Sequence, residues 1–352
     1  MSFEDGWAAI NLEMPPRVPH TEYSVHEHWG VIEAVTGLKI TPDSPPALKH
    51  QGALALIKAW NFDFWWSTLI SDGEVAACST DMGHADYSAG GVDRRDTIYC
   101  PFETPEEVLD FDPWAAYGAR DEAELIRRFE ESYQQQRAAM PDLVTMTGIY
   151  ITVISGLIAI FGWEMLLLAA GVDPKRFGEM TNRYVSWIQQ YYNALGKADV
   201  PVVMVHDDIV WSSGPFISPR WYREYVFPNY KKLFEPLHDA GKRIMYTSDG
   251  DYTKFVDDLA GCGVHGFVLE PWTDMQYIAD VYGKTHVFIG NADTRILLRG
   301  KKDEIRAEVE RCMAIGKLYP GFFLAVGNHI PPNTPVESVL YYMDVYQELS
   351  RR

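Results

Sequence analysis

Residues 202–208 of the chain read VVMVHDD, so an apolar run ends directly in a histidine and two carboxylates. The same pattern returns downstream, where residues 243–250 read RIMYTSDG, residues 266–271 read GFVLEP and residues 322–329 read FFLAVGNH. Helical patterns separate these runs, for example over residues 219–240 and 302–317. Short apolar runs that alternate with helices are typical of βαβ units and of a parallel sheet.

Eight such strands are expected along the chain, which is the number that closes a (β/α)8 TIM barrel. We therefore predict an α/β fold with one domain over residues 1–352, an N-terminal extension and a loop insertion at 71–113. No glycine-rich phosphate loop follows an early strand, which argues against a doubly wound nucleotide-binding sheet. The predicted strands are residues 18–24, 62–68, 143–149, 202–205, 243–246, 266–269, 286–289 and 322–326.

The composition is that of a globular protein with an acidic surface. The chain has 352 residues, of which 47% are hydrophobic, and its net charge of −18 argues against binding to nucleic-acid phosphates. Its four cysteines form no CxxC pair, and its N-terminus lacks the features of a secretory signal, so a cytoplasmic location is expected. Residues 149–170 form the longest apolar stretch, and its polar interruptions predict a buried turn and helix rather than a membrane span.

Polar residues gather directly after the predicted strands. In a barrel, the carboxyl ends of all strands open at the same face, so these side chains are expected to converge in one pocket. Imidazole, carboxylate, hydroxyl and amide groups in such a pocket can move protons or hold a divalent metal ion. We predict as catalytic residues His206, Asp207, Tyr246 and Asn291, and as metal ligands Asp249, Glu270 and His329.

Each of these residues also has a structural interpretation. Successive strand residues face opposite ways, so one of the three polar residues at 206–208 is expected to be buried and hydrogen-bonded. Asp251 is the expected helix cap, which leaves Asp249 to face the pocket. Pro271 ends its strand and leaves Glu270 at the barrel mouth, while the proline-rich loop after His329 serves equally well as a rigid ligand support or as a simple turn.

Histidines outside the strand ends give weaker signals. His26 and His28 have the spacing of a metal pair on a strand, but a solvated segment is the preferred interpretation. His84 lies in the predicted insertion, from which it could reach over the pocket.

Several blocks of the C-terminal half resemble a known superfamily. Residues 217–228 are similar to the motif LSPxxFxEFxxP, residues 238–241 to HxxG, residues 290–293 to GNxDP, and residues 327–335 to GCxxPPxTP or GHGxxPxTP. In this order the blocks resemble the uroporphyrinogen decarboxylase-like superfamily, which also contains cobalamin-dependent methyltransferases. The resemblance implies a (β/α)8 barrel, in agreement with the number of predicted strands.

The departures from the superfamily motifs bear on function. The arginine-rich RQAGR segment of the decarboxylases is missing, and Arg17 stands almost alone near the N-terminus. The HxCG and GC motifs, through which thiol methyltransferases bind zinc, are replaced by residues 247–250 (TSDG) and by Gly327-Asn328. A thiolate zinc site is therefore excluded, but the oxygen and nitrogen donors that are present still suit zinc.

The resemblance thus implies a corrinoid-dependent methyltransferase of the O-demethylase type. It would move a methyl group from a small, methoxylated aromatic ether to the Co(I) of a separate corrinoid protein, because the chain has no corrinoid-binding DxHxxG segment. The cofactors expected are zinc in this chain and cobalamin in the partner. Two alternatives stay open: a decarboxylase of a carboxylated substrate, and a non-catalytic binding barrel. The sequence also leaves a homodimer open.

Overall fold

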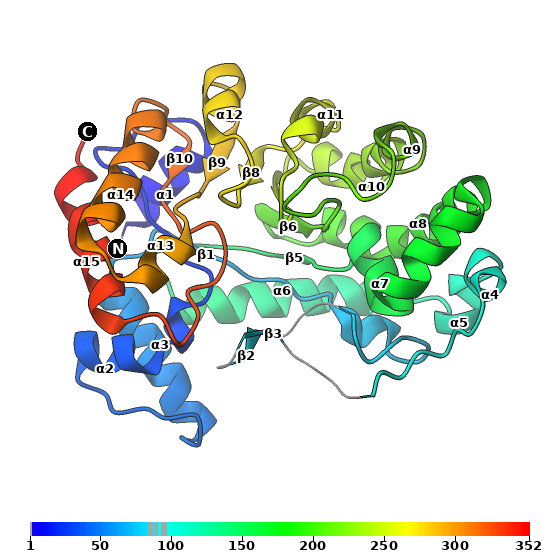
Figure 1. Cartoon of the computed structure of the whole chain (residues 1–352), viewed down its shortest axis with the longest axis horizontal. Helices are drawn as coiled ribbons and strands as arrows, with labels where there is room; N and C mark the ends of the chain where they lie inside the picture. Colours follow the sequence, from blue (N-terminus) through cyan, green and yellow to red (C-terminus); the bar gives the residue numbers. More distant parts are fainter. Residues whose placement is uncertain (1, 84–86, 89–90, 93–96) are drawn as a thin grey trace.

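A computed structural model describes residues 2–83, 87–88, 91–92 and 97–352 (Figure 1). Six of its strands form one parallel sheet in the order β10-β9-β8-β7-β6-β5, and β1 pairs with β4 in parallel. The strands are β1 (Phe64–Trp65), β4 (Val144–Thr145), β5 (Thr147–Ile149), β6 (Val202–His206), β7 (Arg243–Thr247), β8 (Gly266–Val268), β9 (Val287–Ile289) and β10 (Phe322–Phe323).

The sheet closes into a barrel through residues 18–21, which lie between β10 and β1. His20 forms a parallel bridge with Leu324 next to β10, and the carbonyl of His20 accepts a hydrogen bond from the backbone N of Asp63, at 3.0 Å, next to β1. Only Met146 separates β4 from β5, so the two form one run. The ring therefore has eight positions: residues 18–21, β1, the β4–β5 run, and β6 to β10. The predicted (β/α)8 barrel is confirmed, and each predicted strand occupies one of these positions.

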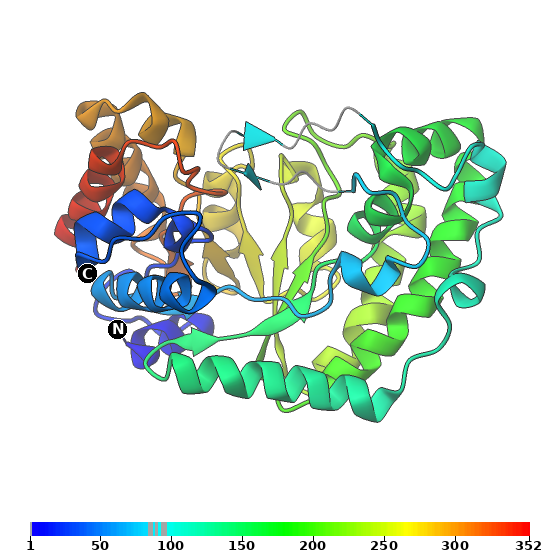
Figure 2. The same ribbon diagram turned by 90° about the horizontal axis from the view of Figure 1, so that it is seen from below.

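Helices surround the barrel (Figure 2). The predicted helix at 219–240 is broken at Val226 into α9 and α10, whereas the helix predicted at 302–317 matches the single helix α14 within one residue. The helices are α1 (Phe3–Ile10), α2 (Trp29–Thr36), α3 (Pro46–Ala59), α4 (Pro105–Leu109), α5 (Pro113–Tyr117), α6 (Glu122–Ala139), α7 (Ile154–Val172), α8 (Pro174–Lys197), α9 (Pro219–Tyr225), α10 (Phe227–Asp239), α11 (Val256–Ala260), α12 (Met275–Tyr282), α13 (Thr294–Arg299), α14 (Lys302–Gly316) and α15 (Val336–Leu349).

The N-terminal extension and the insertion lie at opposite ends of the barrel. Ala9 and Ile10 of α1 pack with barrel-interior residues such as Phe64 and Val144, so α1 closes the amino end. The insertion contains the 3-10 helix η2 (Asp72–Val75), α4 and the antiparallel strands β2 (Tyr87–Ser88) and β3 (Gly91–Val92), which Figure 2 shows beyond the carboxyl ends of the strands. The expectation of loops alone was therefore too simple. His84 lies outside the described residues.

Helix α7 is long and apolar enough to cross a membrane by length and composition, but 67% of its apolar window is buried inside the protein. It bends at Gly162, whose φ of 71° suits glycine because a Cβ would be strained there. The prediction of a buried turn and helix near residues 149–170 is confirmed. The chain folds as a globular α/β protein.

Candidate active site

The two faces of each strand determine which side chains reach the pocket. Met204 and Met245 point into the barrel and pack in its inner core, whereas Val205 and Tyr246 belong to the larger core between strands and helices. Because side chains alternate along a strand, His206 follows Met204 and faces inward. The inner face at the carboxyl ends of the strands therefore forms the candidate site.

A cavity of about 520 Å³ occupies this inner face. Its volume is in the range of small-molecule sites. Aromatic rings supply much of its wall, and its polar residues come from the ends of strands that are far apart in sequence. The lining residues are Tyr23, His26, Trp65, Trp66, Ser67, Thr68, Tyr150, Met204, His206, Thr247, Ser248, Asp249, Val268, Gly327, Asn328 and His329.

His206 is held firmly at the wall of this cavity. Its ring stacks on the Tyr150 ring with a centroid distance of 3.9 Å and an interplanar angle of 7°. Its Nδ1 lies 3.3 Å from the hydroxyl of Ser155, and its Nε2 lies 3.3 Å from Oδ1 of Asp208. Ser155 also accepts a hydrogen bond from the backbone N of Asp208, at 2.8 Å, so it fixes the whole turn after β6.

His206, Asp208 and Asp249 form a group that can hold a metal ion. Each offers one ligand atom, and these atoms all lie within 4.8 Å of one another. Asp208 also accepts a hydrogen bond from the backbone N of Asp249, at 2.9 Å, which joins the ends of β6 and β7. One imidazole and two carboxylates suit zinc, and three protein ligands leave a coordination position free for a substrate. The donor set therefore fits a catalytic divalent metal ion.

Gly250 makes this arrangement sterically feasible. Its φ is +85°, and a Cβ there would come within 2.6 Å of the Trp211 backbone. The next residue, Asp251, accepts a hydrogen bond from the backbone N of Thr253 at 3.0 Å and so stabilises the turn, but the cap position of the 3-10 helix η3 (Thr253–Phe255) is Tyr252, so the prediction of Asp251 as the helix cap is wrong. Asp249 is thus left at the cavity wall, as its neighbour takes the structural role.

Asp207 does not face the cavity, contrary to the prediction. It is fully buried behind β6, where its carboxylate accepts hydrogen bonds from the Tyr230 hydroxyl at 2.5 Å and from the Ser155 backbone N at 2.6 Å. Burial raises the pKa of Asp207 from 3.8 to about 6, although these hydrogen bonds oppose the shift. Its neighbour Asp208 takes the place in the pocket because strand residues alternate.

Tyr246 and Asn291 also lie away from the cavity. Tyr246 is completely buried on the outer face of β7, and its hydroxyl donates to the backbone carbonyl of Asp207 at 3.0 Å. The Asn291 amide donates to the backbone carbonyls of Glu270 and Thr273, at 3.2 Å each, and its Oδ1 accepts from Arg311. Both residues join strands or loops, so their predicted place in the pocket is wrong.

Glu270 supports the site from behind. Its carboxylate accepts a hydrogen bond from the backbone N of Gly250 at 2.7 Å and another from the Asn328 amide. It thereby ties the loop after β7 to the loop after β10, and burial raises the pKa of its carboxyl. Among the described residues, Glu270 does not belong to the group that could hold a metal, in contrast to its prediction as a ligand.

His329 lines the cavity but, within the described chain, also lies outside that group. Burial lowers its pKa. His26 lines the same cavity, and burial, followed by the charge of His329, lowers the pKa of His26 to about 4. His28 is buried, with its Nε2 2.9 Å from the carbonyl of Thr334. The interpretation of His26 and His28 as a solvated segment is therefore wrong.

Two aromatic residues of the site were missed in the sequence. Tyr23 follows the first strand position and Trp66 follows β1, and their rings stack with centroids 4.9 Å apart. Within the described part of the chain, the Tyr23 hydroxyl and Trp66 Nε1 are buried without a hydrogen-bond partner. Burial and nearby carboxylates such as Glu22 raise the pKa of Tyr23, which keeps its proton. The signal was their position: both lie near the carboxyl end of a predicted strand, residues 18–24 and 62–68.

The fold and the site define a (β/α)8 barrel with polar side chains at the carboxyl ends of its strands. Comparison with known proteins identifies its family. The family model for uroporphyrinogen decarboxylase (URO-D) matches residues 124–349. The chain therefore belongs to the uroporphyrinogen decarboxylase family, which is a family of enzymes.

Among curated relatives, a uroporphyrinogen decarboxylase of Thermus thermophilus is 30% identical over 161 residues, which cover 46% of this chain and 45% of the relative. That of Syntrophotalea carbinolica is 26% identical over 178 residues, covering 51% and 50%. The chain thus matches about half the length of these relatives. A solved methyltransferase from Methanosarcina mazei shares the fold over 99% of both chains, with a TM-score of 0.67 and 18% sequence identity.

Proposed function

We propose that the protein is a methyltransferase that takes the methyl group of a methoxylated aromatic ether and passes it to the Co(I) of a separate corrinoid protein. The observation that carries the proposal is the group of His206, Asp208 and Asp249 at the wall of a cavity lined with aromatic rings. The fold shared with the methyltransferase from Methanosarcina mazei supports it.

The chemical problem in such a reaction is the leaving oxygen. When the bond between the methyl carbon and the ether oxygen breaks, both bonding electrons stay on the oxygen, which therefore gains negative charge. A zinc ion held by His206, Asp208 and Asp249 would supply the positive charge that stabilises this oxygen, an effect worth several kcal/mol. Ser155 and Tyr150 hold the His206 ring, Ser155 also holds the backbone at Asp208, and the Asp208 carboxylate accepts a hydrogen bond from the backbone N of Asp249.

Tyr23 is the second group that serves the leaving oxygen in this proposal. It lines the cavity, keeps its proton, and has no hydrogen-bond partner within the described residues. Its hydroxyl can therefore donate a hydrogen bond to an oxygen that becomes negative. Tyr23 thus takes the place of Tyr246, which the sequence predicted as a catalytic residue but which lies behind β7.

A decarboxylase is the second candidate, and the family and the names of the curated relatives favour it. Such an enzyme needs cations for the carboxylates of its substrate. However, neither arginine nor lysine occurs among the described residues that line the barrel cavity. Arg17 precedes the first strand position, at the opposite end of the barrel, and donates to Asp63 and Tyr346.

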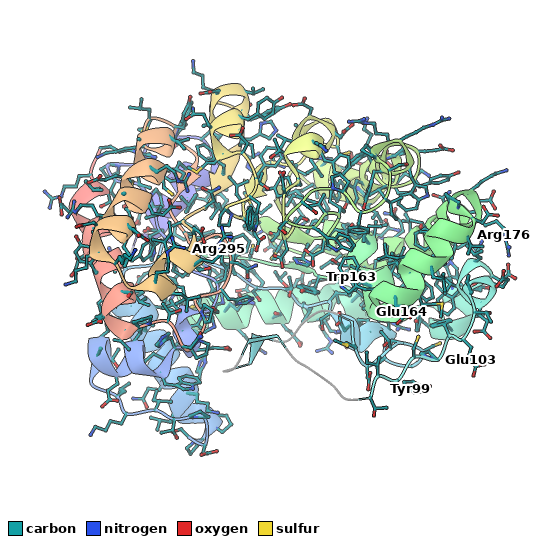
Figure 3. The ribbon with its side chains drawn as sticks, in the orientation of Figure 1. Tyr99, Glu103, Trp163, Glu164, Arg176 and Arg295 are labelled. Atoms are coloured by element: carbon teal, nitrogen blue, oxygen red, sulfur yellow. The ribbon has the colours of Figure 1, made fainter. Side chains whose placement is uncertain are left out.

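Three further arginines among the described residues are engaged away from the barrel cavity. Arg223 pairs with Asp258 at the surface, and Arg243 bonds to Asn11 at the start of β7. Arg295, labelled in Figure 3, pairs with Asp293 at 2.6 Å. We therefore prefer methyl transfer, in which the substrate is neutral.

The test is a spectroscopic assay with a reduced corrinoid protein and a panel of methoxylated aromatics. Methylation of the corrinoid should depend on this enzyme, and the proposal includes a cytoplasmic location for both proteins. Release of carbon dioxide from a carboxylated substrate, with no methylation from any ether, would establish the decarboxylase instead. Binding of ethers without either reaction would identify a non-catalytic barrel.

A further inference from the structure

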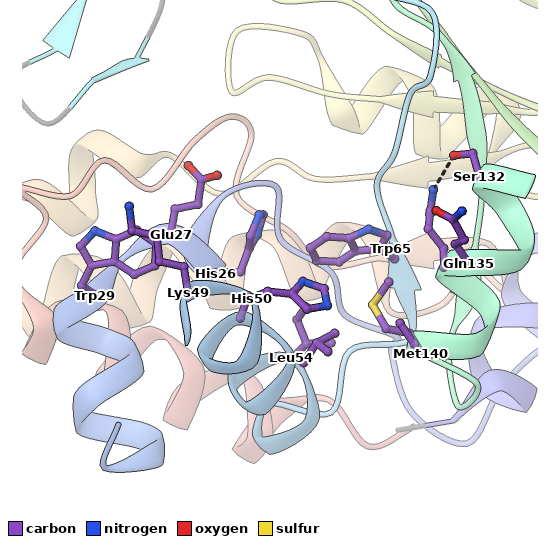
Figure 4. A pocket seen from close by; sticks show the side chains of 14 residues that line it. His26, Glu27, Trp29, Lys49, His50, Leu54, Trp65, Ser132, Gln135 and Met140 are labelled. Atoms are coloured by element: carbon purple, nitrogen blue, oxygen red, sulfur yellow. Dashed lines mark hydrogen bonds between the residues drawn. The ribbon is translucent and has the colours of Figure 1, made fainter. Parts of the chain in front are cut away.

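A second cavity, of about 720 Å³ (Figure 4), shares lining residues with the barrel cavity. It lies between α3, the end of α6, β1 and the segment that leads into α2. His26 and Trp65 line both cavities. In addition, the amide of Gln136 in the second cavity donates to the hydroxyl of Ser67 in the barrel cavity, at 2.8 Å. Side chains of His26, Trp65 and Gln136 therefore lie at the boundary between the two cavities.

Two aromatic side chains pack against each other at this boundary. The rings of His26 and Trp65 meet at an angle of 61° with centroids 4.8 Å apart. Both residues are only half-buried. Rotamer changes of such side chains are fast compared with catalysis. One elongated ligand can therefore occupy both cavities.

The lining of the second cavity indicates what it binds. Trp29, Trp65 and Met140 supply apolar surface, and Figure 4 shows them around the same space. The charges of Lys49 and Glu27 are opposite, and the pKa of His26, lowered to about 4 by burial, leaves that imidazole neutral near pH 7. The cavity therefore favours a neutral aromatic group over an anion or a cation.

Two polar atoms in the second cavity lack partners. Within the described residues, Oε1 of Gln136 and Nδ1 of His26 are buried without a hydrogen bond. A buried acceptor without a partner is costly, so a ligand that donates a hydrogen bond there gains affinity. A hydroxyl group on the bound ring would supply that donor.

We infer that the substrate is an extended, neutral aromatic methyl ether with two rings. The methoxylated ring occupies the barrel cavity, and the second ring, with a hydroxyl group for Gln136, occupies the second cavity. The inference rests on the proposed function and specifies its substrate class.

Binding alone tests the inference, without any catalytic step. The probes are 4-methoxyphenol, with one ring, and 4'-methoxybiphenyl-4-ol, with two, and the readout is isothermal titration calorimetry on the whole chain. The two-ring probe should bind on the order of tenfold tighter, because the second ring adds several well-packed atoms. Equal affinities of the two probes would overturn the inference.

Substitutions that fill the second cavity locate the binding of the second ring. Ala139 is exposed at the end of α6 and lines this cavity, whereas the adjacent Ala138 is also exposed but does not line it. Ala139→Trp should remove the tenfold preference for two rings and leave the affinity for one ring unchanged. Ala138→Trp should change neither. If Ala139→Trp keeps the preference, the second ring lies elsewhere and the inference fails.

A second matched pair guards against a folding defect. Gln135 lines the cavity and Gln134 does not, and both are exposed on α6. Gln135→Trp should therefore behave as Ala139→Trp, and Gln134→Trp as the wild type. If the preference for two rings responds as expected but no ether is demethylated, the proposed methyl transfer fails while the two-cavity binding stands. If ethers are demethylated without a preference for two rings, only this inference fails.

Discussion

Two groups of buried polar side chains near the candidate site, one on each face of the barrel wall, differ in their hydrogen bonds. On the outer face, Asp207 receives two hydrogen bonds, and the hydroxyls of Tyr230 and Tyr246 both have partners. On the inner face, the Tyr23 hydroxyl and Trp66 Nε1 have none within the described chain. Satisfied buried groups hold a fold together, whereas unsatisfied ones that face a cavity await a ligand. Function is therefore to be sought inside the barrel.

The sharpest test of this contrast is a change at the metal-binding group. Asp249→Asn keeps the size of the side chain but removes a negative ligand. Because a charge contact in the transition state is lost, we expect the rate of methyl transfer to fall by roughly 100- to 1000-fold, together with the metal content. The measurements are the corrinoid methylation rate and elemental analysis.

Asp251→Asn is the matched control, because Asp251 lies two residues away and stabilises a turn instead of lining the cavity. It should leave the metal content unchanged and the rate within about twofold. If the Asp249 variant retained both its metal and its activity, the inner group would not be the site.

On the outer face, Asp207 should make the stability of the protein depend on pH. The pKa of Asp207 is raised to about 6 in the folded protein, above its ordinary value of 3.8. The folded state therefore holds this proton more tightly than the unfolded state. The stabilisation that protonated Asp207 contributes to folding is complete below pH 4 and is lost as the pH rises through 6. In the wild type, the free energy of unfolding should therefore fall by about 2 kcal/mol between pH 4 and 7, measured by urea titration. In Asp207→Asn this fall should be absent.

His26, at the inner face, should make stability depend on pH in the opposite direction. Its pKa is lowered to about 4 in the folded protein, so its contribution to stability is complete above pH 6.5 and is lost as the pH falls through 4. His26→Gln should therefore stabilise the protein relative to the wild type only at the acidic end. If the free energy of unfolding changed with pH in the same way in Asp207→Asn and His26→Gln, the two faces would not differ in how their ionisable groups affect stability.

A loss of stability of similar size is expected from Tyr230→Phe, which removes the hydroxyl that donates to Asp207. A hydrogen bond to a buried carboxylate contributes about 2 kcal/mol, so the free energy of unfolding at pH 7 should fall by that amount. The rate of methyl transfer should stay constant at a temperature where the variant is folded. A loss of rate without a loss of stability would place Asp207 in the reaction after all.

The smallest change concerns Tyr23→Phe on the inner face. Loss of one neutral hydrogen bond to the leaving oxygen should lower kcat about tenfold, which corresponds to about 1.4 kcal/mol, with little change in KM. Stability should hold or rise slightly, because a buried hydroxyl without a partner among the described residues is removed. A variant that lost stability but kept kcat would show that the hydroxyl serves the fold.

Much of the fold could be predicted because its signal is local. An apolar run such as residues 202–205 followed by polar residues predicts a strand that ends at the barrel mouth, and the structure has a strand there. The break between α9 and α10 at Val226 was missed, although Pro228 in the first turn of α10 is a signal for a helix start, because proline lacks the backbone N–H that a continuous helix requires. The insertion was predicted as loops only, since short elements such as α4 give little periodic signal.

The site was predicted only in part. The sequence placed polar residues at the mouth, and His206 and Asp249 do line the cavity. It could not say which of Asp207 and Asp208 faces inward, because a shift of one residue in the strand exchanges the two faces. It also could not pair Tyr23 with Trp66, which are distant along the chain and meet only when the barrel closes.

The sequence by itself determined the eight strands, the end of the barrel at which polar groups gather, and the absence of thiolate ligands at Asp249 and Asn328. These are properties of residue type and local order. Tertiary structure alone decided which carboxylates share a site, which ones brace the fold, and that a second cavity lies beyond His26 and Trp65. Such choices depend on strand register and on packing between distant segments, where a displacement of one residue reverses the direction of a side chain.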